Sequence, residues 1–318
     1  MLNTFFNLCL ICLICIANLA YPSYINNISL DAFKIDTKES TKTSTEIVQP
    51  KEETRSEEIY TKNLPNYIKP ISINDETQLP ITLFLPTISK KHLFPTTKYI
   101  RATRTPVTST VNFLKTYMNI PKINSLKIRN RVLYLNFSSR NNFSEYDSEI
   151  LYILVNTLTS IDGVDGVLFL VDGKKVDNLL GNENTINIFY NNYSYAYLSY
   201  DYNGRNLLVP TNVAHMDKVI KVLKSDKDEL KGVMPKGVEL LDYSITQDTI
   251  TLNFNKNFLK AYNDRPDLKN MLIDSLNYSY TSFEEINNLE IKVDGKKITT
   301  FGDYDLSVPM KGLSIINP

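Results

Sequence analysis

Histidine chemistry has two candidate residues in this chain, because His92 and His215 are its only histidines. A Ser-His-Asp hydrolase needs a histidine as its general base. His92 lies in a charged segment, residues 89–93 (SKKHL), and His215 lies near the start of a predicted helix. No G-x-S-x-G motif accompanies either residue. The sequence therefore favours surface or hydrogen-bonded histidines over a catalytic base.

Three carboxylates, Glu145, Asp147 and Glu149, lie close together in the sequence. A pair of carboxylic acids is what glycoside hydrolysis requires, and such a pair would suit an enzyme acting on a cell wall. The three residues also fall at a predicted helix start, where the helix dipole favours acidic side chains. We therefore expect a structural role and no enzymatic activity.

The sequence signals for cofactor sites are equally weak. Cys9, Cys12 and Cys15 resemble part of an iron–sulfur ligand run, but the chain has no fourth cysteine. Gly173 is followed by two lysines, yet the segment lacks the glycine and the Ser or Thr of a P-loop. We expect no metal and no cofactor.

A tyrosine-rich segment, residues 190–202, is the most distinctive local feature. Its alternation indicates a strand on which Tyr193, Tyr195 and Tyr197 share one face. Such an aromatic strip can stack on sugars or peptides, or anchor a protein interface. The same rings can instead cover a hydrophobic core. Both interpretations stay open at this point.

Composition and charge place limits on the partners. The chain has 318 residues, of which 42% are hydrophobic and 11% are aromatic, so it can bury a sizeable core. Its 35 basic residues balance 35 acidic residues. This balance gives no general attraction to nucleic acid. We expect no nucleic acid partner and no small-molecule substrate.

The N-terminal segment, residues 1–24, predicts export. It contains the apolar run FFNLCLICLICIANLA, which fits a signal peptide or an N-terminal membrane anchor. We expect the chain to be held on the extracytoplasmic face of the cell membrane, or to be secreted if the segment is cleaved. A lipid anchor is not favoured, because isoleucine precedes both Cys12 and Cys15. The expected membrane-anchor residues are Phe5, Phe6, Leu8, Leu10, Ile11, Leu13, Ile14 and Ile16.

Residues 25–78 have a different composition. Much of this segment is charged and rich in Ser and Thr, with few periodic apolar residues, as in KESTKTSTEIVQPKEETRSEEIYTK. This composition is typical of a disordered linker.

The remainder of the chain repeats itself. Residues 132–137 (VLYLNF) match residues 249–254 (TITLNF), and residues 169–176 (FLVDGKKV) match residues 291–298 (IKVDGKKI). The Asp-Gly pair between apolar strands predicts a tight hairpin turn. Earlier segments also correspond: TLFL at 82–85 and NIFY at 187–190 are expected to open the two copies, and each copy has a later Pro-Thr pair.

Helices are expected between these strands. In the first copy, Pro106 begins one helix and Ser144 with Asp147 caps another. In the second copy, one helix spans the apolar residues of 216–223 and Pro266 lies in the first turn of the other. Each copy then reads strand, strand, helix, strand, strand, helix, strand, strand. This order predicts an α+β fold of two repeated α/β-sandwich units, each with helices packed on a mainly antiparallel sheet. The tail from Leu306 is expected to add an edge strand.

In content and order, these motifs resemble a tandem arrangement of the GerMN domain, a domain of sporulation and spore germination proteins. In the first copy the resemblance is carried by TLFLP, by residues 94–100, by VLYLNFS, by Asn156-Thr157-Leu158 and by VLFLVDGKKV. In the second copy it is carried by LLVPT, MPKGVELLDYSI, TITLNF and IKVDGKKI. It assigns residues 79–184 to a first GerMN domain and residues 185–318 to a second.

The resemblance implies a non-enzymatic, exported and membrane-tethered protein of spore-forming bacteria. Such a protein would support assembly of an envelope complex. Its expected partners are proteins of the cell envelope, further copies of itself and the membrane that holds its N-terminus. The alternative is a module that binds cell-wall glycan or peptide through Tyr193, Tyr195 and Tyr197.

Overall fold

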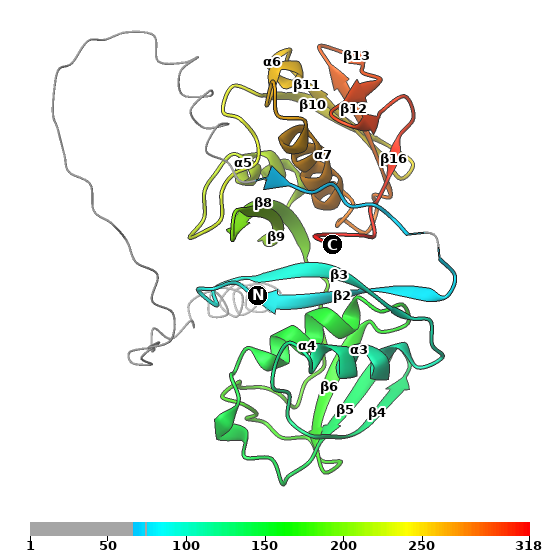
Figure 1. The fold of residues 1–318 in the computed structure, drawn as a ribbon, viewed down its shortest axis with the longest axis vertical. Helices are drawn as coiled ribbons and strands as arrows, with labels where there is room; N and C mark the ends of the chain where they lie inside the picture. Colours follow the sequence, from blue (N-terminus) through cyan, green and yellow to red (C-terminus); the bar gives the residue numbers. More distant parts are fainter. Residues whose placement is uncertain (1–65, 74) are drawn as a thin grey trace, which may run out of the picture. The chain divides into compact units, whose positions relative to one another are not determined.

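The computed structural model describes residues 66–73 and 75–318, all of which fall within one structural unit of the chain. These residues form two copies of one α+β arrangement, in which helices lie between a long hairpin and a larger sheet (Figure 1). The predicted α+β class, with mostly antiparallel sheets, is confirmed.

The first copy begins with the hairpin of β2 and β3. Its helices are α3 and α4, and its sheet has the order β4-β5-β6-β7. The bounds are β2 (Gln78–Pro86), β3 (Leu93–Arg101), α3 (Pro106–Leu114), β4 (Ile123–Arg129), β5 (Val132–Phe137), the 3-10 turn η1 (Phe143–Glu145), α4 (Ile150–Thr159), β6 (Gly166–Val171) and β7 (Phe189–Tyr190).

The second copy follows the same plan, with a longer second helix. Its hairpin is formed by β8 and β9, and its sheet has the order β10-β11-β12-β13. The bounds are β8 (Ser194–Tyr202), β9 (Arg205–Val213), the 3-10 turn η2 (Met216–Lys218), α5 (Val219–Leu223), β10 (Leu240–Thr246), β11 (Thr249–Phe254), α6 (Asn257–Lys260), α7 (Pro266–Tyr280), β12 (Asn288–Val293) and β13 (Lys296–Lys297). The chain then forms the small pair β14 (Thr300–Phe301) and β15 (Tyr304–Asp305), and β16 (Met310–Lys311) pairs with β12.

One pairing in each copy is parallel. Strand β5 pairs with β6, and β11 pairs with β12, because a helix crosses over between them and returns the chain to the same end of the sheet. The edge strands β4 and β10 pair antiparallel with β5 and β11, and each carries an irregularity at the equivalent place. The two copies therefore share register as well as element order.

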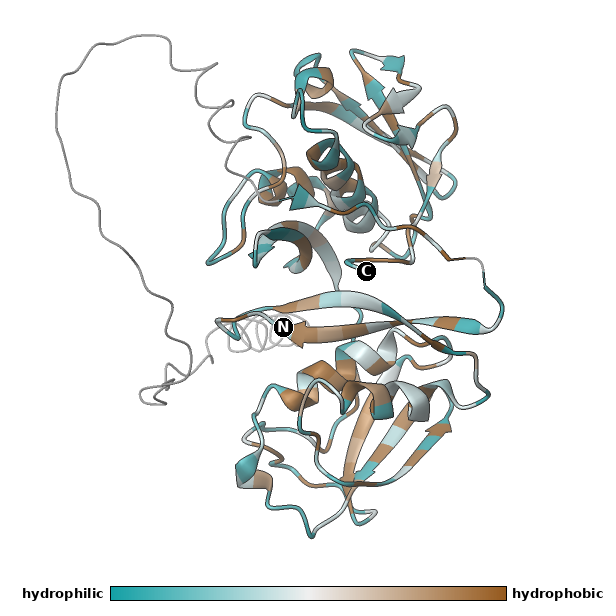
Figure 2. Cartoon of the chain, in the orientation of Figure 1, coloured by the Kyte–Doolittle hydropathy of each residue, from teal (hydrophilic) through white to brown (hydrophobic). Residues whose placement is uncertain are grey.

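Each copy has its own hydrophobic core. In the first copy, α4 buries Leu151, Leu154 and Leu158 against the hairpin and against Leu133 and Leu135 of β5. The brown segments of α4 and of the central sheet strands in Figure 2 show this concentration of apolar residues. Burial of such side chains supplies roughly 1.5–3 kcal/mol each and fixes which helix face points inward.

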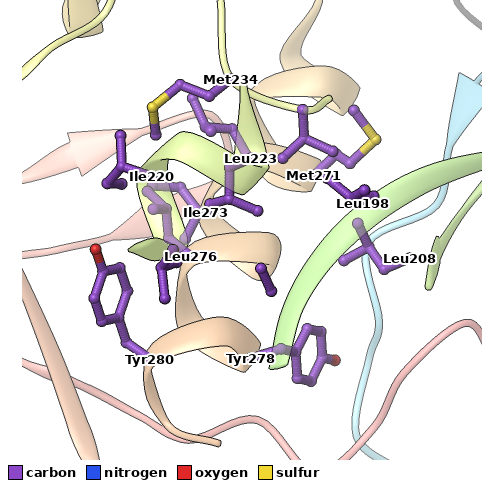
Figure 3. Close-up of a cluster of buried hydrophobic side chains, with 14 of the residues drawn as sticks. Leu198, Leu208, Ile220, Leu223, Met234, Met271, Ile273, Leu276, Tyr278 and Tyr280 are labelled. Atoms are coloured by element: carbon purple, nitrogen blue, oxygen red, sulfur yellow. The ribbon is translucent and has the colours of Figure 1, made fainter. Parts of the chain in front are cut away.

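The core of the second copy surrounds α7. Ile273 and Leu276 of α7 lie among Leu198 of β8, Leu208 of β9 and Leu223 of α5 (Figure 3). From Asn270 onward, helix α7 is buried on every side, polar residues included. Its polar side chains must therefore find partners inside the protein.

Two local predictions are wrong. Residues 187–190 do not open the second copy, since Phe189 and Tyr190 pair with β6 and extend the sheet of the first copy. Ser144 does not cap α4, which begins at Ile150 without a side-chain cap; the Ser144 hydroxyl donates instead to Asn142. The chain is held in a 3-10 turn at this point, so the S-x-x-D pattern does not coincide with the helix start.

The segment before the first copy returns to the second copy. Strand β1 (Asn66–Tyr67) pairs in parallel with β9, and Tyr67 is buried. These residues lie within the range whose composition predicts a linker. A single buried aromatic residue, rather than a long apolar pattern, fixes this contact.

The chain after β16 contacts the hairpins of both copies. The Asn317 side chain donates to the Pro95 carbonyl of β3 and to the Leu208 carbonyl of β9, and it accepts from the Leu208 N–H. The Thr97 N–H donates to the Ile316 carbonyl. This tail therefore satisfies backbone groups of β3 and β9. The predicted edge strand after Leu306 is present as β16.

Candidate interaction surfaces

The segments that are most similar between the two copies have structural roles. Asn136, within Leu-Asn-Phe of β5, accepts a 2.7 Å hydrogen bond from the Gly173 N–H, and Asn253 of β11 accepts a 2.8 Å bond from the Gly295 N–H. Asp172 and Gly173 both have positive φ, at 45° and 80°, as a tight turn between strands requires. The repeated motif is thus a strand residue that fixes the adjacent turn, in agreement with the turn interpretation.

Hydroxyl residues at the end of each main helix hold the neighbouring hairpin. In the first copy, Thr157 accepts from the Phe84 N–H at 3.0 Å, and Ser160 donates to the Thr82 carbonyl. These contacts close one edge of β2 without another strand.

The second copy has the same contacts. Ser279 accepts from the Tyr197 N–H at 3.0 Å, and Ser282 accepts from the Tyr195 N–H at 2.8 Å. We call Thr157 with Ser160, and Ser279 with Ser282, the helix hydroxyl pairs. Residues 157–160 (TLTS) and 279–282 (SYTS) match, but this short match alone does not predict a contact with the hairpin.

The side chains of the tyrosine strip differ in how far they are exposed. Tyr193 is 58% exposed, whereas Tyr195 and Tyr197 are half-buried and their rings contact each other. Tyr197 also packs on Tyr278 of α7, with 5.4 Å between ring centroids. Burial raises the pKa of Tyr195 to about 12 and raises that of Tyr197 as well. Much of the strip therefore covers the second core, and Tyr193 extends beyond it.

The two histidines lie in different surroundings. The His92 ring lies 3.2 Å from a carboxylate oxygen of Asp228, and burial lowers the pKa of His92 despite this partner. His215 precedes η2 as its N-cap residue without a side-chain cap bond. No serine hydroxyl is paired with either ring among the described residues. The arrangement provides hydrogen bonding for His92, as the sequence favoured.

The acidic cluster lines a small cavity in the first copy. Glu145, Asp147 and Glu149 surround about 140 Å³ together with Lys90, whose Nζ lies 2.9 Å from Asp147. Lys90 and Asp147 are both partly exposed, so this ion pair contributes little to stability. Within residues 66–73 and 75–318, no group of His, Cys, Asp and Glu has an arrangement that would hold a metal ion.

Among the described residues, the acidic group with the most perturbed pKa is a buried carboxylate that no sequence pattern indicates. Asp274 on α7 is fully buried, and both of its oxygens accept hydrogen bonds, from Tyr67 at 2.7 Å and from Tyr304. Burial raises the pKa of Asp274 to about 6. The hydrogen bonds from Tyr304 and Tyr67 partly oppose this rise, and so does Lys69, whose Nζ lies 3.7 Å above the Tyr304 ring. The site joins β1 and β15 to α7.

The surface of β10 is unusually apolar for an edge strand. Leu241, Tyr243 and Ile245 are 51%, 42% and 44% exposed. Large exposed apolar groups on one strand mark an interaction surface more often than isolated ones do.

The predicted membrane anchor lies outside the described residues. Its positions are Phe5, Phe6, Leu8, Leu10, Ile11, Leu13, Ile14 and Ile16. Within the part of the chain that the structure describes, no helix is long and apolar enough to cross a membrane.

Comparisons with known proteins agree with the repeated architecture. The Germane family, described as "Sporulation and spore germination", matches residues 82–177 and 200–299. No curated protein matches the chain.

Among solved structures, the tandem GerMN domains of the sporulation protein GerM from Bacillus subtilis match with a TM-score of 0.61. That match covers 76% of this chain and 100% of the other, at 14% identity. The first GerMN domain of the same protein covers 37% of this chain and 94% of its own, at 14% identity and a TM-score of 0.28. A putative lipoprotein from Clostridium perfringens covers 39% and 92%, at 19% identity and a TM-score of 0.25. The first of these matches shows a shared fold.

Proposed function

Because the chain belongs to the Germane family of sporulation and spore germination proteins, we propose that it is a non-enzymatic component of an envelope complex in spore development. In this proposal, residues 1–24 export the chain and tether it to the membrane, and the two repeated units present surfaces to protein partners. The observation that carries the proposal is the exposed apolar strip of Leu241, Tyr243 and Ile245 on an edge strand. An exposed edge of this kind favours protein contact.

A non-enzymatic role is supported by what the recurring residues do. Asn136 and Asn253 bind their own turns, and the helix hydroxyl pairs bind the adjacent hairpins. The residues that the two copies share are therefore used for folding. These shared motifs therefore contain no residues that could form a reaction centre common to both copies.

The test is deletion of the gene in a spore-forming host, followed by counts of heat-resistant spores. We expect fewer such spores, and we expect the wild-type chain to restore the count. A variant with Glu145→Gln, Asp147→Asn and Glu149→Gln should restore it equally. Unchanged spore counts after deletion would contradict a role in spore development, and loss of rescue by the carboxylate variant would contradict the non-enzymatic part.

Tethering has its own test. Ile11→Asp with Ile14→Asp should move the chain out of the membrane fraction, because two carboxylates in the apolar run oppose insertion. The control is Thr41→Asp with Thr43→Asp, which makes the same charge change in the charged segment. Equal membrane retention of both variants would contradict an anchor in residues 1–24.

A second candidate is binding to cell-wall glycan or peptide. It is favoured by the exposure of Tyr190 and Tyr193, at 47% and 58%, just before β8. Cosedimentation of the full chain with peptidoglycan tests it. Tyr190→Ala with Tyr193→Ala should release the chain from the pellet, whereas Tyr202→Ala, at another exposed tyrosine, should not.

A further inference from the structure

Each of the two larger sheets begins with an edge strand whose outer edge pairs with no other strand among the described residues. These strands are β4 in the first sheet and β10 in the second. An antiparallel edge strand directs the N–H and C=O groups of alternate residues outward, where another strand can bind them. The two edges are equivalent, because the register shift lies at Ile123/Ser125 in β4 and at Leu240/Asp242 in β10.

The apolar residues of both edges point to the same side of their sheets. Tyr243 and Ile245 of β10 are opposite Leu252 and Ile250 of β11, which are fully buried on the helix-covered face. Ile128 of β4 is likewise opposite a buried residue of β5 and is 50% exposed. In both copies the apolar face therefore continues beyond the helices that cover it.

The charges of the two edges are complementary. Residues 77–144, which include β4, contain eleven Lys and Arg residues and no Asp or Glu. Lys127 and Arg129 of β4 are exposed, and neither forms an ion pair with a described residue. Residues 238–255, which include β10, contain Glu239, Asp242 and Asp248 and no Lys or Arg.

The charges also lie on matching faces. Lys127 and Arg129 are opposite residues of β5 that alternate with its buried leucines, so they point away from the helices. Asp242 is opposite Asn253, which likewise alternates with the buried residues of β11, so Asp242 also points away from the helices. If β4 and β10 pair antiparallel, their apolar side chains meet on one face and their opposite charges meet on the other.

We propose that β4 of one chain pairs antiparallel with β10 of a second chain, so that copies join head to tail through a continuous sheet. Pairing of β4 with β4 would oppose Lys127 and Arg129 to their own copies, and pairing of β10 with β10 would oppose two Asp242 side chains. Like charges across strands disfavour both alternatives. A head-to-tail contact between different surfaces builds a ring or a filament.

This inference deepens the proposed function and gives it a mechanism of assembly. The experiment measures the mass distribution of the full chain in detergent as its concentration rises. We expect wild-type chains to form dimers and larger species. A β4 variant, Lys127→Glu with Arg129→Glu, should remain monomeric. A β10 variant, Tyr243→Glu with Ile245→Glu, should also remain monomeric, because it places carboxylates on the apolar face.

The decisive measurement is the mass distribution of a mixture of the two variants. Each variant keeps one wild-type edge, and the two altered edges are both acidic, so the mixture should form 1:1 dimers and no larger species. The control is Arg101→Glu with Lys115→Glu, which makes the same charge change outside β4 and should assemble like wild type. Thermal unfolding of each variant confirms that it is folded.

Several outcomes overturn the proposal. They are wild-type chains that stay monomeric at every concentration, a β4 variant that dimerises alone through β10, and a control that loses assembly as fully as the β4 variant. If chains stay monomeric while the β10 variant fails to restore spore counts, the edge binds a different protein. Head-to-tail pairing then fails although the proposed function stands.

Discussion

The hydroxyl of Tyr67 donates a 2.7 Å hydrogen bond to a carboxylate oxygen of Asp274, and this bond joins the segment before the first copy to the main helix of the second. Tyr304 donates to the other oxygen. The carboxylate is fully buried, and two tyrosine hydroxyls donate to it. Removal of a charge from water is costly, so the ionised form is disfavoured here.

Asp274 should make stability depend on pH. Its pKa is about 6 in the folded chain and near the ordinary value of 3.8 in the unfolded chain. Between these values the folded chain binds more protons, so the free energy of unfolding falls as pH rises from about 4 to 6 and stays lower above that range. The shift corresponds to about 3 kcal/mol.

The measurement is urea unfolding of wild type and Asp274→Asn across pH 4 to 7. Asparagine cannot ionise, so the difference between the two chains should change through this window and then level off. The comparison cancels carboxylates with lowered pKa, such as Asp165, which contribute in the opposite direction. A constant difference at every pH would show that Asp274 does not titrate there.

Tyr67→Phe should destabilise the chain by about 1–3 kcal/mol, because the buried carboxylate loses one of its two hydroxyl donors. Thermal unfolding measures the change. Tyr202→Phe is the matched control, since Tyr202 is 41% exposed and should have little effect. Equal effects of the two substitutions would contradict a specific role for the Tyr67 bond.

Thr157→Val and Ser279→Ala should each cost about 1–3 kcal/mol, because each leaves a hairpin N–H without its acceptor. The two sites lie in separate cores, so their costs should add. Hydrogen exchange should become faster at the Phe84 or the Tyr197 amide, respectively. Thr159→Ala, which removes only a hydroxyl bound to its own helix, should leave exchange at both amides unchanged.

Asn317→Ala should destabilise the chain by about 2–4 kcal/mol, because it leaves the Leu208 N–H and two carbonyls without partners. Urea unfolding measures the loss. Asn317→Asp tests the geometry, since a carboxylate cannot donate to the Pro95 and Leu208 carbonyls and should be no better than alanine. Wild-type stability of Asn317→Asp would show that these donor bonds are dispensable.

Much of the fold could be predicted because its signals are local. Apolar alternation located β5 and β11, and Asp172-Gly173 located a turn whose positive φ angles few residue pairs accept. Pro106 and Pro266 begin α3 and α7 as predicted. The strand at 189–190 was assigned to the wrong copy because pairing partners are set by tertiary contacts and not by the strand's own residues.

The candidate surfaces were harder to predict. Tyr195 and Tyr197 alternate as in any strand, and only the position of α7 decides that their rings are half-buried. Asp274 lies in a helix of low mean hydropathy, where a carboxylate is normally exposed; its burial depends on Tyr67, 207 residues away. Exposure of Ile245 depends on where the helix cover ends, and no local pattern encodes that limit.

The bond between Asn317 and the Pro95 carbonyl spans 222 positions of the chain. A ribosome completes the β2–β3 hairpin long before it adds residues 316 and 317. For most of the synthesis of the chain, the outer edge of β3 therefore lacks these partners. Contacts this distant in sequence form late and slowly. The first copy must therefore fold while that edge is still unpaired. Protection of the nascent chain from aggregation matters most during that interval.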